Sequence, residues 1–352
     1  MKKNLIDFLV ILLIVSYDYL RMLGMNNKLV LMGYLLLLVV FLSGKIITNK
    51  ITRKELLKII ILFIVASFST IFVGEVNLLI AILAATYFLK TDENKIVRYF
   101  FITLTSWYIL IVFLYLIGIL DNNSLIRVSQ NETIMRNSLG FSHVNQTFLY
   151  LLPIIFSSYI LYFDKHKKKY SIVIFFIVTI LYLITNCRTG YFSVIVFLLL
   201  INLKVKKRNH NINLTSLIFL LFTICSIFIT KKYGANGSNT INYILSLRPY
   251  YLFYYLNNFS LVTIKGGNFI STIPMDNVYI YLLLEKGIII YLFYLLVIHY
   301  YFSKCEYDKH IENIIYASLL YGLFESYIIL PSINFVFVLI FIEVIKYRKQ
   351  KE

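Results

Sequence analysis

The feature that most constrains this sequence is a succession of long apolar stretches running from residue 5 to residue 346. Most have roughly 17–22 residues, which matches a helix crossing the ~30 Å hydrocarbon core of a bilayer. Inside a bilayer every backbone N–H and C=O group needs a partner within the protein, so helices are favoured over open sheets. Charged residues make up only 14% of the chain, against roughly a quarter in soluble domains. We therefore predict an all-α polytopic integral membrane protein.

The apolar stretches predict about twelve transmembrane helices in a single transmembrane domain covering residues 1–352. The first stretch begins at Leu5 and no small-residue cleavage site follows it, so we expect a retained span and not a signal peptide. The helices are expected near residues 5–22, 29–47, 57–73, 76–90, 96–119, 146–163, 170–186, 190–203, 212–230, 278–302, 312–330 and 333–346.

Basic residues predict the orientation of these helices. The net charge is +17, and lysine clusters such as DKHKKK and KVKKR fall at alternate ends of the expected spans. The positive-inside rule then places both termini in the cytoplasm and leaves two large extracellular loops, residues 120–145 and 231–277. Because the basic residues lie between apolar runs, we expect membrane lipids as partners and no nucleic acid.

Arginine is distributed differently from lysine. Most lysines fall on the predicted inner side, whereas five of the nine arginines fall on the outer side. A guanidinium group is a planar fork of donors suited to phosphate. This concentration of arginine on the outer side suggests phosphate binding at that face. The five arginines on this side are Arg21, Arg127, Arg136, Arg188 and Arg248.

The first extracellular loop carries polar side chains just before a predicted helix. His143 is a candidate acid or base because histidine titrates near neutrality, and Arg136 is a candidate phosphate or sugar contact. The alternative is a solvated loop with an ordinary helix cap. The polar residues are Arg127, Glu132, Arg136, His143, Asn145 and Gln146.

Two further stretches place arginines at the outer boundary. TNCRTGY, residues 185–191, predicts a tight turn in which Gly190 supplies the turn geometry and Arg188 is held near the bundle, with snorkelling as the alternative. The stretch 241–258 has apolar residues at helical spacing, which predicts an interfacial helix that presents Arg248 among tyrosines.

Carboxylates are the remaining candidates. Asp276 and Asn277 directly precede a predicted helix, whereas Glu285 and Lys286, further along it, could simply pair with each other. Glu325, in YGLFESY, is expected deepest in the bilayer, where an ionisable residue is a functional candidate.

Other chemistries find little support in the sequence. Cys187, Cys225 and Cys305 are too scattered for a disulfide framework or a metal-ligand spacing. The inner loops are short and the sequence contains no GxxxxGK[ST] phosphate-binding motif. We therefore expect no cofactor and no metal.

Taken in order, several motifs resemble the O-antigen and capsule polysaccharide polymerase/ligase family. They cover residues 136–335, and the first five predicted helices carry none of them. The motifs are RNSLGFSHVNQ, NCRTGY, SLRPYYLFYYL, GGN, DNVYIYLLLEKGIII and YGLFESYIILPSIN.

The resemblance implies a metal-independent polymerase at the outer face of the bacterial plasma membrane. It would join undecaprenyl-pyrophosphate-linked oligosaccharides, with a chain-length regulator and a flippase as further partners. Arg136, Arg188 and Arg248, with Asn145, Asn277 and Glu325, would contact the substrate.

Two departures from the family pattern leave the general base open between Asp276 and His143. The chain has Asp276-Asn277 where ligases often carry His-Asn, which favours a polymerase. It also has Val144 where an HPN-like motif would have proline.

A lipid-linked oligosaccharide flippase or secondary transporter is the competing interpretation. Such proteins usually show paired halves and ionisable groups near the midplane. No internal repeat is visible in this sequence, and its charged motifs gather on the predicted outer side, which favours the polymerase.

Overall fold

A computed structural model describes most of the chain. The described residues are 2–23, 33, 36–37, 39–40, 43–44, 51–74, 76–123, 125–129, 132–203, 214–237, 240–259, 263–267, 275–305, 308–326, 330–331 and 333–347, without the side chains of 2–3, 125–129, 132–134 and 243–244. Two compact units are formed: unit 1 from residues 1–50, 83–204 and 330–339, and unit 2 from residues 51–82, 205–329 and 340–352. Both are helical, which agrees with the predicted class. The predicted span 29–47 lies largely outside the described residues.

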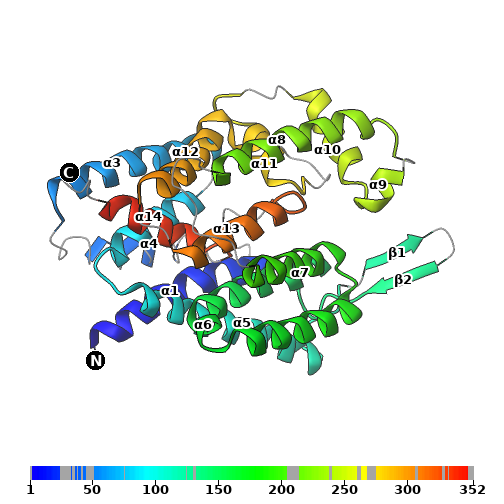
Figure 1. Ribbon diagram of the computed structural model, residues 1–352, viewed down its shortest axis with the longest axis horizontal. Coiled ribbons are helices and arrows are strands. Elements are labelled where there is room, and N and C mark those ends of the chain that lie inside the picture. The colour runs from blue at the N-terminus through cyan, green and yellow to red at the C-terminus, as the bar shows by residue number, and fades with distance from the viewer. Residues whose placement is uncertain are drawn as a thin grey trace. The chain divides into compact units, whose positions relative to one another are not determined.

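Unit 1 is built on α1 (Lys2–Met22), α5 (Glu93–Leu116), α6 (Val144–Thr185) and α7 (Arg188–Asn202). Helix α5 packs against α1 and α6, and α6 packs against α7 (Figure 1). Several polar contacts join α1 to α5, and the most buried carboxylate among them is that of Asp7, which is 1% exposed and lies 2.9 Å from the ammonium of Lys95. Pairing offsets the high cost of burying a carboxylate.

Helix α6 is two antiparallel helices joined at His166. The backbone there is non-helical, with φ −141° and ψ 39°. The Tyr170 hydroxyl donates to the carbonyl of Ile155 at 2.7 Å. In a straight helix these residues would be ~22 Å apart at 1.5 Å per residue, so the chain reverses at His166. This reversal matches the two separate helices predicted at 146–163 and 170–186.

The turn between α6 and α7 depends on Asn186 and not, as predicted, on Gly190. Asn186 ends α6 in the left-handed region with φ 52°, which asparagine tolerates better than most residues. Gly190 is helical within α7, and a Cβ added there would lie 2.3 Å from Cβ of Phe148. The glycine is needed for close approach of α7 to α6, so its role was misassigned from the sequence.

The extracellular loop predicted at 120–145 contains a β-hairpin that the all-helical prediction missed. Strand β1 (Leu125–Ser129) pairs antiparallel with β2 (Glu132–Arg136), and the hairpin projects from the helices of unit 1 (Figure 1). Both strands, LIRVS and ETIMR, are rich in apolar and β-branched residues, which favour extended backbone. The side chains of Arg127 and Glu132 lie outside the described residues.

Unit 2 is organised around α8 (Leu214–Tyr233), which contacts α10 to α13. The face of α8 that it buries carries Thr215, Thr223, Ser226 and Thr230, whereas leucines and isoleucines elsewhere on the helix are exposed. Small polar residues between helices and apolar residues outside are typical of packing in a bilayer.

The other elements of unit 2 are shorter. They are α3 (Arg53–Phe68), η1 (Ser69–Val73), α9 (Thr240–Ile244), α10 (Arg248–Asn258), α11 (Val278–Tyr281), η2 (Leu282–Lys286), α12 (Ile288–Lys304) and α13 (Lys309–Tyr321). Helices α4 (Asn77–Phe88) and α14 (Val336–Lys346) contribute residues to both units.

The helix predicted at 278–302 is interrupted at Gly287, where φ is +83°. The segment 263–267 docks on this interruption: the N–H of Gly267 donates to the carbonyl of Leu284 at 2.9 Å, and that of Ile288 donates to Thr263 at 2.8 Å. A Cβ at Gly266 would lie 2.0 Å from the carbonyl oxygen of Glu285. The docking of two backbones therefore replaces the missing helical hydrogen bonds.

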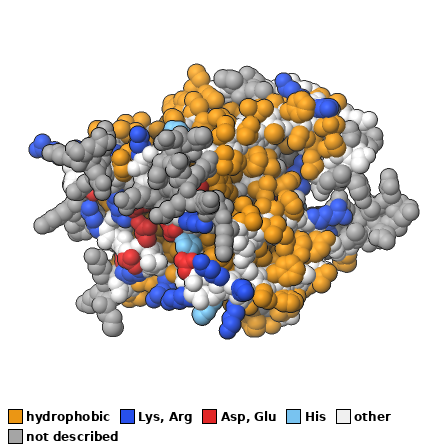
Figure 2. Space-filling view, viewed as in Figure 1, with side chains coloured by type: hydrophobic (Ala, Val, Ile, Leu, Met, Phe, Trp, Pro, Cys, Tyr) orange, Lys and Arg blue, Asp and Glu red, His pale blue; other side chains and the backbone are white. Residues whose placement is uncertain are grey.

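Four described helical segments are long and apolar enough to cross a membrane by length and composition. They are Arg53–Val73, Glu93–Leu116, Leu214–Tyr233 and Val144–Thr185, the last of which comprises the two antiparallel helices that meet at His166. Hydrophobic side chains cover much of the face shown in Figure 2. A helical membrane protein is therefore supported. The count of twelve spans and the position of the termini stay predictions.

Candidate functional site

Arg248 is the first residue of α10, just after a sharp turn. The sequence predicted one helical face across 241–258, but the backbone of Ser246 and Leu247 is left-handed, with φ 56° and 62°. The turn separates α9 from α10, and Pro249 follows in the first turn of α10, where proline is well tolerated. Arg248 begins the helix that carries the tyrosines, but it is only 8% exposed and is therefore not presented on the surface as predicted.

The partners of Arg248 lie at the C-terminal end of α13. That helix was predicted to end at residue 330, but it ends at Tyr321. Glu325 consequently lies in the turn after it. Three successive carbonyls of the turn accept hydrogen bonds from other segments. Gly322 accepts from the N–H of Val278 at 2.8 Å, Leu323 from the Asn277 side chain at 3.1 Å, and Phe324 from Nε of Arg248 at 3.1 Å.

Arg248 lies between two carboxylates. Its Nη2 donates to Oε1 of Glu325 at 3.2 Å, and Glu325 is 3% exposed. Oδ2 of Asp276 lies 3.9 Å from Nε, and the Asp276 side chain is 28% exposed. Glu325 therefore anchors the guanidinium from the buried side, while Asp276 is the carboxylate that solvent and a ligand can reach. Among the described residues Nη1 of Arg248 has no hydrogen-bond partner.

Asn277 fixes the position of Asp276. Its Oδ1 accepts from the N–H groups of Tyr279 and Ile280 as the cap of α11. Its Nδ2 donates to the Ser226 hydroxyl at 2.9 Å and to the carbonyl of Leu323. The side chain is 3% exposed, so in this structure its polar atoms form hydrogen bonds within the protein. Ser226 was not predicted, because its hydroxyl lies within an apolar helix with no motif around it.

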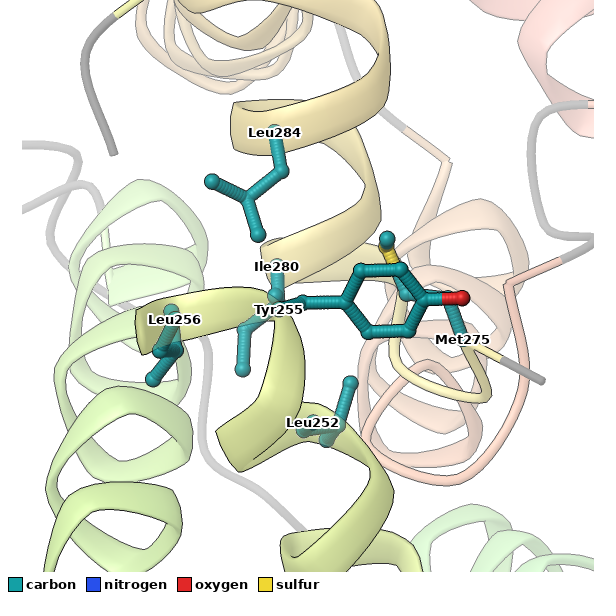
Figure 3. Close-up of a cluster of buried hydrophobic side chains, with 6 residues drawn as sticks. All are labelled: Leu252, Tyr255, Leu256, Met275, Ile280 and Leu284. Atoms are coloured by element: carbon teal, nitrogen blue, oxygen red, sulfur yellow. The ribbon is translucent and has the colours of Figure 1, made fainter. Parts of the chain in front are cut away.

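An apolar cluster lies next to the charged residues and joins α10 to the start of α11 and η2 (Figure 3). Leu252 is one turn from Arg248, and Met275 directly precedes Asp276. Burial of a large apolar side chain contributes roughly 1.5–3 kcal/mol. Packing of this cluster therefore holds the two charged positions in register. Its members are Leu252, Tyr255, Leu256, Met275, Ile280 and Leu284.

In unit 1 the structure brings Arg136 together with Asn145. Nη2 of Arg136 donates to Oδ1 of Asn145 at 3.0 Å, and the Cys187 thiol lies 3.7 Å from the same oxygen. Asn145 is 9% exposed and lies in the first turn of α6. Arg136 and Asn145, both in RNSLGFSHVNQ, thus form a polar contact that joins the end of β2 to α6.

His143 is the N-cap of α6, as the alternative interpretation of the loop had it. Its Nδ1 accepts a hydrogen bond from the N–H of Asn145 at 3.1 Å. A neutral imidazole that accepts through Nδ1 carries its proton on Nε2 and so presents a donor there. In this arrangement His143 is poorly suited to act as a general base, and Asp276 is the better candidate.

Arg188 is the first residue of α7 and is exposed. Among the described residues it has no hydrogen-bond or ion-pair partner. The close approach of Gly190 to Phe148 fixes the start of α7 against α6. Arg188 therefore combines a free guanidinium group with a fixed backbone.

The predicted site residues thus fall into two sets. Arg136, His143, Asn145 and Arg188 belong to unit 1, whereas Arg248, Asp276, Asn277 and Glu325 belong to unit 2. No group of three or more His, Cys, Asp or Glu side chains able to hold a metal ion is found in the described part of the chain. Comparisons of the chain with protein-family models, with curated proteins and with solved structures found no match.

Proposed function

We propose that this protein is a polysaccharide polymerase. It joins undecaprenyl-pyrophosphate-linked oligosaccharide repeat units at the outer face of a bacterial plasma membrane. The single observation that carries the proposal is the arrangement around Arg248: a buried guanidinium fixed by Glu325 and the Phe324 carbonyl, next to the accessible carboxylate of Asp276.

This arrangement fits a glycosyl transfer from a lipid diphosphate. The acceptor hydroxyl oxygen attacks the anomeric carbon of the donor, the new glycosidic bond forms, and the bond from that carbon to the phosphate oxygen breaks. Asp276 takes the hydroxyl proton as general base. The lipid diphosphate leaves with the electron pair, and Nη1 of Arg248 stabilises its developing charge.

The charges of the cluster couple these two events. With all groups ionised, Arg248 faces two negative carboxylates. When Asp276 accepts the proton its negative charge disappears, at the moment when negative charge develops on the leaving diphosphate. Arg248 then attracts the leaving group more strongly than it attracts the ground state, which is what lowers a barrier. The roles of Arg136 and Arg188 as diphosphate or glycan contacts rest on the family resemblance.

The decisive experiment removes the guanidinium without leaving a buried charge. Replacing Arg248 alone strands Glu325, whereas replacing a buried ion pair with apolar residues of similar volume is often neutral or stabilising. We expect the double variant Arg248→Met/Glu325→Leu to keep its thermal unfolding temperature. We expect it to lose about 10²- to 10³-fold in polymerisation rate, so that cells accumulate a single lipid-linked repeat unit.

The matched control is Arg21→Ala, which removes an exposed arginine from the same predicted side of the membrane. It should make polymer of normal length. A folded double variant that also makes normal polymer would refute the proposal. Accumulation of the repeat unit on the cytosolic leaflet would instead indicate a flippase.

A further inference from the structure

An apolar groove runs along one face of α3 and η1 in unit 2. It has a volume of about 460 Å³, and its lining falls into two parallel rows, each with a spacing of four residues. Rows at this spacing form ridges on a helix surface, and the space between two ridges is a single narrow channel. One row is Ile59, Phe63, Ser67 and Ile71, and the other is Ile60, Ile64, Phe68 and Phe72.

The groove is open to the surroundings of the protein. Ile64 is 63% exposed and Ile71 is 74% exposed, whereas α3 buries only Glu55, Leu62 and Ala66. The helix is one of those long and apolar enough to cross a membrane. A groove of this kind faces lipid chains, and at 1.5 Å per residue it is about 20 Å long.

A cation lies at one end of the groove. The Lys265 ammonium is 5.6 Å from the centroid of the Phe72 ring. Lys265 itself is exposed, and its segment is fixed by the backbone docking of Gly266 and Gly267 on Glu285 and Leu284. The carboxylate of Glu285 is paired with Lys286 at 3.0 Å.

The opposite end of α3 lies by the C-terminal end of the chain. Lys58, one residue before the groove, donates to the carbonyls of Val344, Ile345 and Tyr347. The groove thus runs from this tail to the segment that carries Lys265. With the tail predicted on the cytoplasmic side, the Lys265 end is the outer one.

We propose that this groove binds the tail of a polyprenyl phosphate, with the phosphate at Lys265. A single channel between two ridges of one helix accommodates one extended chain, whereas a phospholipid carries two. The phosphate would complement the exposed ammonium at the outer end. The inference rests on the proposed function for its choice of lipid and adds to it the place where the carrier lies.

The test uses a photoreactive polyprenyl phosphate without sugars, bound to the full chain in nanodiscs of phosphatidylethanolamine and phosphatidylglycerol. Mass spectrometry should find labelled residues within 59–72, and unlabelled polyprenyl phosphate should compete. Ser67→Phe, which fills the channel from its smallest side chain, should abolish this labelling. Ile61→Phe, which introduces the same side chain on the same exposed helix but outside the groove, should leave it unchanged.

Lys265→Gln should weaken binding of the polyprenyl phosphate roughly fivefold, the effect of one cation near a membrane surface. Binding of the uncharged polyprenol should not change. Equal competition by phosphatidylglycerol, or equal labelling of the Ser67→Phe variant, would overturn the inference and indicate an ordinary lipid-facing surface.

Failure of this inference is distinguishable from failure of the proposed function. Labelling is measured without any glycan, so it does not depend on polymerisation. Loss of polymer in the Arg248→Met/Glu325→Leu variant together with absent groove labelling would refute only the binding of the lipid tail in the groove. Specific labelling of the groove with normal polymer in that variant would refute only the proposed polymerase function.

Discussion

The ion pair between Arg248 and Glu325 is buried on both sides, with side-chain exposures of 9% and 3%. In such a pair the removal of one partner is far more harmful than the removal of both, because one charge is left without compensation. We expect Glu325→Ala to destabilise the protein by about 3–5 kcal/mol, measured as a lower thermal unfolding temperature in detergent. Glu325→Gln keeps an acceptor for Nη2 and should cost less. If neither change lowers the unfolding temperature, the pair with Glu325 does not stabilise Arg248.

Asp276 and His143 differ in what their proton-accepting atoms already contact. We expect Asp276→Asn to reduce polymerisation by about 10²- to 10⁴-fold, since an amide cannot accept the hydroxyl proton. Its unfolding temperature should change little, because the Asp276 side chain is 28% exposed and asparagine has nearly the same size. Asparagine is a good N-cap, so His143→Asn should keep both the helix and the polymer. The reverse pattern of activities would assign the base to His143.

At the level of elements, the packing of α7 on α6 depends on a glycine within a helix. We expect Gly190→Ala to destabilise the protein by about 1–3 kcal/mol, the usual cost of overpacking, because its Cβ would overlap the Phe148 side chain. Truncating the neighbour in Gly190→Ala/Phe148→Ala should recover part of this loss relative to the sum of the two single changes. Thermal unfolding measures all three variants.

Gly237→Ala is the control for Gly190. A Cβ at Gly237 would meet Tyr250 at an ordinary 3.4 Å, so a small effect is expected. If Gly190→Ala were as mild as Gly237→Ala, close packing of α7 on α6 would not be required.

At the scale of the whole molecule, the reversal at His166 tests the predicted orientation. The cluster at 164–169 is expected inside and the loop at 120–145 outside. In a chain whose three cysteines are replaced, we expect a membrane-impermeant maleimide to label Asn123→Cys in intact cells. Lys168→Cys should be labelled only after the membrane is permeabilised. Labelling of Lys168→Cys in intact cells would invert the orientation and place Arg188 on the cytoplasmic side.

Local patterns in the sequence predicted the helices well, since long apolar runs have only one way to satisfy their backbone in lipid. The helices predicted at 57–73, 96–119 and 212–230 correspond to Arg53–Val73, Glu93–Leu116 and Leu214–Tyr233. The errors occur where the backbone makes its hydrogen bonds outside a helix. These are the hairpin of β1 and β2, the break at Gly287, the turn at Ser246 and Leu247, and the early end of α13 at Tyr321.

By itself, the sequence determined the class of protein and the identity of the candidate polar residues. The length of an apolar stretch and the positions of its flanking charges are properties of single segments, so they can be identified without any knowledge of tertiary contacts. Only the tertiary structure decided which polar residues meet. Glu325 contacts Arg248 across 77 residues of sequence. The two are brought together because three carbonyls after the end of α13 accept hydrogen bonds from α10 and from the start of α11. No local pattern records such a contact, since its partners are chosen by the packing of distant segments.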